Sequence, residues 1–95
     1  MKTKNEYIEI LATQLKEWSA EVDHLTAKAE NAAALLKTSY IEELDVLRAK
    51  QQAAEEKLKE LEESGKYGWL ALKDTADQVW DDLRIGLADV AAKLT

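Results

Sequence analysis

Residues 8–36 read IEILATQLKEWSAEVDHLTAKAENAAALL, and their apolar positions recur in alternating steps of three and four. That spacing gives a helix one apolar stripe and is typical of a coiled-coil seam. Such a stripe needs a partner, so we predict that this stretch drives self-association. The predicted self-association seam comprises Leu11, Leu15, Trp18, Val22, Leu25, Ala29, Ala32 and Leu36.

The helical pattern extends on both sides of this stretch. Upstream, Thr3 to Glu6 has the spacing of a capping box, in which a Thr hydroxyl accepts the amide hydrogen of the third helical residue. Downstream, the first residues that favour a stop are Gly65, suited to the left-handed position after a helix, and Gly68. We therefore predict one long helix from about residue 3 to about residue 63.

A second, shorter helix is predicted from about residue 69 to about residue 94. The loop between the helices, residues 64–68, is short, which implies that they lie antiparallel. The predicted fold class is therefore all-α, a long helix with a shorter antiparallel helix. The residues expected to pack in this hairpin are Leu44, Leu47, Leu58 and Leu61 on the long helix and Trp69, Leu72, Val79, Leu83 and Leu87 on the short one.

The unequal lengths of the two helices leave two assemblies open. The shorter helix covers only about residues 39–63, so the seam has no partner within a simple hairpin. In an antiparallel homodimer centred near residue 33, each seam lies on the partner's second half, and two three-helix bundles meet at Ala32 to Ala34. A break near Lys37 to Ser39, at a second capping-box match over residues 39–42, gives a monomeric three-helix bundle instead. We favour the dimer because this hinge region contains neither Gly nor Pro.

Composition agrees with one helical domain spanning residues 1–95 and narrows the range of partners. The chain has no Pro and only three Gly, and its 46% hydrophobic residues are enough to build a seam between helices. A net charge of −6 opposes binding to nucleic acid, which depends on clustered Lys and Arg. With no Cys and no apolar run long enough for a signal peptide or a membrane span, we expect a cytoplasmic protein without disulfides.

Two groups of polar side chains have spacings that occur in metal or catalytic sites. Glu21 and His24 have the Glu-x-x-His spacing of di-iron helical bundles, but such a site needs a second copy of the motif. Asp77, Asp81 and Asp82 form an acidic cluster, which on one exposed helix face lacks the cleft that catalysis or cation binding requires. We therefore expect no metal, no cofactor and no enzymatic activity.

Three stretches carry a resemblance to a known family: MKTKNEYIEILATQLKEWSAEVDHLTAKAE at 1–30, EELDVLRAKQQAAEEKLKELEESG at 42–65 and WLALKDTADQVWDDLRIGLADVAAKL at 69–94. With these stretches the chain resembles small coiled-coil stress-response proteins of proteobacteria and cyanobacteria. The surroundings of Trp18 and the spacing from Trp69 to Trp80 are its most specific parts, whereas Leu94 stands where that family tends to have an aromatic residue. The resemblance implies an association with stress in a bacterium and supplies no catalytic or ligand-binding residues.

These observations predict a non-enzymatic interaction or scaffold protein that self-associates and engages other proteins through its free faces. The alternative is an amphipathic lipid- or client-binding protein that opens its hairpin to expose the face around Trp80. Acidic residues such as Asp77, Asp81 and Asp82 surround that face, so binding to an anionic membrane is disfavoured.

Overall fold

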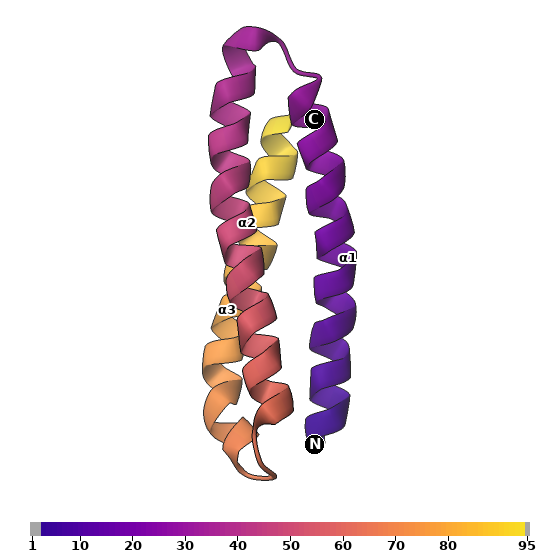
Figure 1. Cartoon of the computed structure of the whole chain (residues 1–95), viewed down its shortest axis with the longest axis vertical. Helices are drawn as coiled ribbons and strands as arrows, with labels where there is room; N and C mark the ends of the chain where they lie inside the picture. Colours follow the sequence, from indigo (N-terminus) through magenta and orange to yellow (C-terminus); the bar gives the residue numbers. More distant parts are fainter. Residues whose placement is uncertain (1–2, 95) are drawn as a thin grey trace.

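Three helices make up the computed structural model, which describes residues 3–94. They are α1 (Lys4–Glu30), α2 (Ala34–Glu63) and α3 (Gly68–Leu94), and each one contacts the other two. Figure 1 shows them side by side in an elongated bundle that measures 51 × 17 × 17 Å. The prediction of an all-α protein with an antiparallel helix after residue 68 is confirmed, and the single chain forms a three-helix bundle by itself.

The long helix expected from about residue 3 to 63 is wrong for this chain, because a turn at residues 31–33 divides it into α1 and α2. At this turn the backbone N–H of Asn31 donates to the carbonyl of Lys28, and Ala33 takes an extended conformation with φ −59° and ψ 147°. Folding α1 back onto α2 and α3 buries the apolar stripe of α1 without a second chain, which outweighs the helix propensity of the turn residues. The break proposed near residues 37–39 is also misplaced, since those residues lie inside α2.

The other helix ends agree more closely with the sequence. The Thr3 hydroxyl accepts the amide hydrogen of Glu6 at 3.2 Å, so the predicted cap of α1 is confirmed. At the end of α2, the Ser64 hydroxyl donates to the carbonyl of Leu61 at 2.6 Å. No glycine in the described part of the chain has a positive φ, so the left-handed role expected of Gly65 is wrong.

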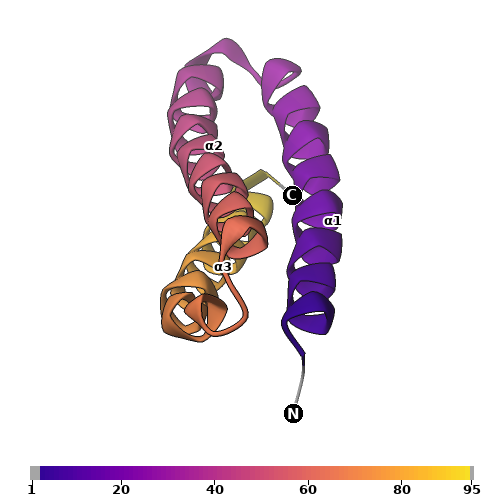
Figure 2. The same cartoon turned by 60° about the horizontal axis from the view of Figure 1, so that its bottom comes forward.

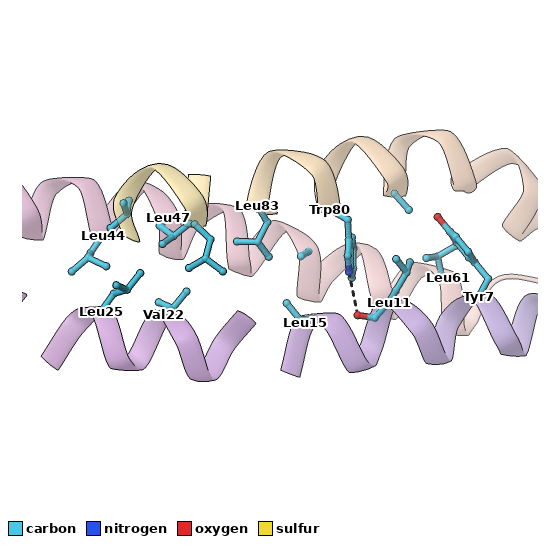
Figure 3. Close-up of a cluster of buried hydrophobic side chains, with 14 of the residues drawn as sticks. Tyr7, Leu11, Leu15, Val22, Leu25, Leu44, Leu47, Leu61, Trp80 and Leu83 are labelled. Atoms are coloured by element: carbon cyan, nitrogen blue, oxygen red, sulfur yellow. Dashed lines mark hydrogen bonds between the residues drawn. The ribbon is translucent and has the colours of Figure 1, made fainter. Parts of the chain in front are cut away.

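One continuous core runs along the axis of the bundle, and Figure 3 shows its central part. Burying each of its fully covered leucines stabilises the fold by roughly 1.5–3 kcal/mol. Close contact between α2 and α3 is aided by Gly86, where a Cβ atom would lie 3.3 Å from the Leu47 side chain. The buried residues are Tyr7, Leu11, Leu15, Val22, Leu25 and Ala29 of α1, Leu44, Leu47, Ala54 and Leu61 of α2, and Trp69, Ala76, Trp80, Leu83, Leu87 and Val90 of α3.

Candidate interaction surface

Most of the predicted self-association seam lies in the core of the single chain. Trp18 is half-buried and packs against that core, and Ala32 is half-buried in the turn. Leu36 is different, because half of its surface is exposed. In this form of the molecule, α2 and α3 therefore occupy the seam, and only its last member remains open to a partner. The buried members are Leu11, Leu15, Val22, Leu25 and Ala29.

The residues expected to pack in the hairpin come together between α2 and α3. Leu58, Leu72 and Val79 are half-buried at the edge of the core and pack against it. Trp80 is buried, although the sequence pattern placed its neighbour Val79 in the stripe, so the stripe of α3 is rotated toward Trp80. The remaining hairpin residues are buried: Leu44, Leu47, Leu61, Trp69, Leu83 and Leu87.

The bundle has three helices along most of its length but only two at the α1–α2 turn. Lys93, one residue before the end of α3, pairs with Glu43, so the part of α2 before residue 43 extends beyond α3. Both views show the end of α3 stopping short of the α1–α2 turn (Figures 1 and 2). We call this part of the bundle the open end, and the opposite end, where α2 turns into α3, the closed end.

Large apolar side chains are exposed on α2 at the open end. Leu35 is 96% exposed, Leu36 50% and Ile41 40%. Leu36 continues the inward stripe of Tyr40 and Leu44, at a spacing of one helical turn, but α3 does not reach far enough to cover it. We call Leu35, Leu36 and Ile41 the end patch.

At the open end, the start of α2 lacks a side-chain cap, whereas the end of α1 is capped by Asn31 and carries Lys28 in its last turn. The N-cap of α2 is Ala33, whose side chain cannot accept a hydrogen bond, and the first turn holds no acidic residue but does contain Lys37. Glu30 is the last residue of α1, at the terminus where the helix dipole disfavours negative charge. The side-chain amide of Asn31 donates to the carbonyl of Ala27 at 3.0 Å, so only the α2 side of this turn lacks a cap.

At the closed end, polar contacts fasten α1 to α3. The Trp80 Nε1–H donates to the carbonyl of Leu11 at 3.1 Å, as Figure 3 shows. The Tyr7 hydroxyl donates to the Asp77 carboxylate and lies 3.2 Å from the carbonyl of Lys73. Burial, together with the hydrogen bond to Asp77, raises the pKa of Tyr7 above its usual value. A groove of about 400 Å³ beside these contacts is lined in part by Tyr7, Asp77 and Trp80, whose polar groups already have partners.

The sequence did not indicate the Tyr7 contact, because the two partners lie far apart along the chain. The available signal was the position of Tyr7, one helical turn before Leu11, which extends the apolar stripe of α1 toward the N-terminus. Asp77 also pairs with Lys73, at 3.7 Å between Nζ and Oδ2. Part of the acidic cluster on α3 is thus used to hold the bundle.

The other polar candidates lie apart from one another on the surface. Glu21, His24 and Asp82 are exposed, and Asp81 pairs with Arg84 at 3.4 Å. Within residues 3–94, no three His, Cys, Asp or Glu side chains come close enough to hold a metal ion. Over the same residues, no helix is both long and apolar enough to cross a membrane.

Comparisons with known proteins give no match: no family model, curated protein or solved structure is similar to the chain. The chemistry of its own surface is therefore the basis for assigning a function. The end patch contains Leu35, which at 96% is more exposed than Tyr67 (75%) or Val46 (59%) elsewhere on the described surface.

Proposed function

We propose that the chain is a non-enzymatic helical interaction protein that self-associates, forming an antiparallel homodimer through its open end. The observation that supports this proposal is Leu36, which belongs to the inward stripe of α2 yet is half exposed because α3 ends too early. A second copy, turned end to end by a two-fold axis, supplies the missing cover and has its own Leu36 covered in return.

Covering the end patch contributes apolar burial that favours a dimer. Burying the whole side chain of an exposed leucine contributes about 1.5–3 kcal/mol. A two-fold dimer contains two copies of each patch residue, so each residue contributes on both chains. The charge of −6 on each chain opposes the approach of two copies at long range, but physiological salt screens charges more than about 8 Å apart. Added salt should therefore strengthen the dimer.

A matched pair of substitutions tests whether the end patch is the interface. Leu36 and Ile85 are both 50% exposed, but Ile85 lies on α3, away from the end patch. Sedimentation velocity should show that Leu36→Gln shifts the protein from dimer to monomer, while Ile85→Gln leaves the dimer unchanged. If both variants, or neither, dissociate, the end patch is not the specific interface.

The resemblance noted in the sequence adds a role in stress to this proposal. A helical protein that pairs at its open end would act as a scaffold for other proteins when it accumulates. Measuring its abundance in its host before and after heat or oxidative shock tests this part separately. An unchanged level under both conditions would remove the stress role and leave the self-association proposal intact.

The alternative of lipid or client binding requires α1 to separate from α3. That separation breaks the hydrogen bonds of Trp80 and Tyr7 that join these helices. The cost of breaking them disfavours lipid or client binding relative to self-association. Tryptophan fluorescence with neutral and anionic vesicles gives the test. A blue shift with either vesicle would support the alternative.

A further inference from the structure

The α1–α2 turn contains no residue that requires a turn. Asn31 has φ −93° and ψ 1°, Ala33 has φ −59° and ψ 147°, and no residue in the described part of the chain has a positive φ. The residues from Ala32 to Ala34 are alanines, the strongest helix formers. Rotating ψ of Ala33 to about −42° would return it to the helical region. Residues 31–33 can thus form either a turn or a helix.

Straightening the turn would also satisfy amide groups at the uncapped start of α2. The carbonyls of Ala27, Lys28 and Ala29 at the end of α1 already accept hydrogen bonds within the turn. In one continuous helix, the first amide groups of α2 would bond to carbonyls of the preceding turn. Glu30 and Lys37, each now at the helix terminus of unfavourable charge, would then lie in the interior of a helix.

The core faces of α1 and α2 would point the same way in a continuous helix. Leu15 and Leu47, both core residues, are 32 positions apart (47 minus 15), which is within about 40° of nine full turns at 3.6 residues per turn. In an antiparallel pair of long helices, the α1 part and the α2 part of one helix both pack against the same partner chain. Their apolar faces must therefore point in the same direction. The register of the chain therefore suits pairing with a second copy.

From these observations we propose that residues 31–33 are a hinge through which two copies of the chain exchange α1. The hinge straightens, α1 and α2 become one helix, and α1 of each chain packs against α2 and α3 of the other. The core contacts and the bonds of Tyr7 and Trp80 all persist, now between chains. Leu36 gains cover near the two-fold axis. This inference rests on the proposed self-association and specifies how it occurs.

Cross-linking distinguishes exchanged from unexchanged dimers. The chain has no cysteine, so pairs can be introduced without background. Thr26 and Arg48 join α1 to α2 by a hydrogen bond of 2.8 Å, whereas Glu43 and Lys93 join α2 to α3. In an exchanged dimer, a short bismaleimide should link T26C/R48C between chains and give covalent dimers on a denaturing gel. The matched control E43C/K93C should give only links within one chain, because α2 and α3 stay together.

A proline at position 34 tests the hinge itself. Ala34 is the first residue of α2, where proline is tolerated, and ψ 147° at Ala33 suits a residue before proline. Ala34→Pro thus fits the turn but disrupts a continuous helix. It should raise the dimer dissociation constant about 100-fold or more while leaving the thermal unfolding of the single chain unchanged. Asn31→Ala, which removes the C-cap of α1 and adds a helix former, should shift the equilibrium toward dimer.

The outcomes separate this inference from the proposed function. A dimer by sedimentation in which T26C/R48C links only within chains would overturn the exchange and leave self-association intact. A dimer unaffected by Ala34→Pro, with circular dichroism confirming that the variant is helical, would also overturn it. If the unmodified chain and Asn31→Ala are both monomeric at every concentration, the proposed self-association fails, and the exchange with it.

Discussion

The two ends of the bundle are built from similar apolar stripes but differ in what covers them. At the closed end, all three helices meet, and the bonds of Tyr7 and Trp80 tie α1 to α3. At the open end only α1 and α2 remain, α2 begins without a side-chain cap, and leucines are exposed. The same heptad-like pattern thus gives a core where a third helix is present and leaves leucines exposed where it is absent.

The difference follows from where α3 starts and how long it is. With 27 residues, α3 is about 40 Å long at 1.5 Å per residue, whereas α2 with 30 residues is about 45 Å. The Lys93–Glu43 pair leaves residues 34–42 of α2 beyond the end of α3, about 13 Å of helix, so the length difference explains only part of the overhang and the register of α3 explains the rest. Stability should therefore depend on the closed end and the central core, and self-association on the open end.

A charged substitution in the turn at the open end should have the largest effect on association. Ala32→Glu places one carboxylate per chain near the two-fold axis, where both are pressed into an apolar interface. We expect the dimer to weaken by about 3–5 kcal/mol, measured as the dissociation constant by sedimentation. The same substitution at Ala53, exposed on α2, is the control. An Ala32→Glu variant that stays fully dimeric with unchanged melting would place the interface elsewhere.

Truncating a core side chain should have the largest effect on the stability of the single chain. Leu83 is fully buried, so Leu83→Ala should lower the free energy of unfolding by about 2–5 kcal/mol in a urea titration. Leu35→Ala should change it by less than about 0.5 kcal/mol at a concentration where the chain is monomeric, because Leu35 is almost completely exposed. Equal losses for the two variants would contradict the division between a stabilising core and an associating end.

The hydrogen bond between Trp80 and α1 should affect stability but not association. Trp80→Phe removes the hydrogen bond to the carbonyl of Leu11 and leaves space beside a smaller ring, which should cost about 2 kcal/mol of unfolding free energy. The dimer dissociation constant should stay nearly the same if the open end alone sets association. A variant that unfolds as the unmodified chain does would show that this bond is not important to the bundle.

Tyr7→Phe should have the smallest effect, about 1 kcal/mol from the lost hydrogen bond, and that effect should depend on pH. Burial, then Asp77, raises the pKa of Tyr7 in the folded chain above the value of about 10 in the unfolded one. The folded chain therefore holds this proton more tightly, and the stabilisation is complete below pH 10 and declines as pH rises further. The stability difference between Tyr7→Phe and the unmodified chain should thus shrink above pH 10, and a constant difference would contradict this role.

The sequence alone was enough to predict the helical class and much of the packing between α2 and α3. Stripes of Leu and Trp at helical spacing arise from the local periodicity of the residues, which is visible in one sequence. The comparison of helix lengths also anticipated that a C-terminal helix covers only about residues 39–63, close to the observed pairing of Lys93 with Glu43. The open end could therefore be anticipated from lengths before any contact was known.

The position of the turn could not be predicted in the same way. Residues 32–34 favour a helix locally, so whether they turn depends on which surface buries α1, a tertiary effect that no local pattern records. The Tyr7 to Asp77 contact is also tertiary, because it joins residues 70 positions apart in the chain. Residues whose role depends on distant partners were missed, and residues whose role depends on periodicity were found.

The mass of the unmodified chain in solution tests whether the chain self-associates through its open end. Sedimentation equilibrium from low micromolar to high micromolar concentration should show a shift from one 10.7 kDa chain toward two, and the shift should be stronger at higher salt. A mass of one chain across the whole range, at low and high salt alike, would contradict self-association through the open end.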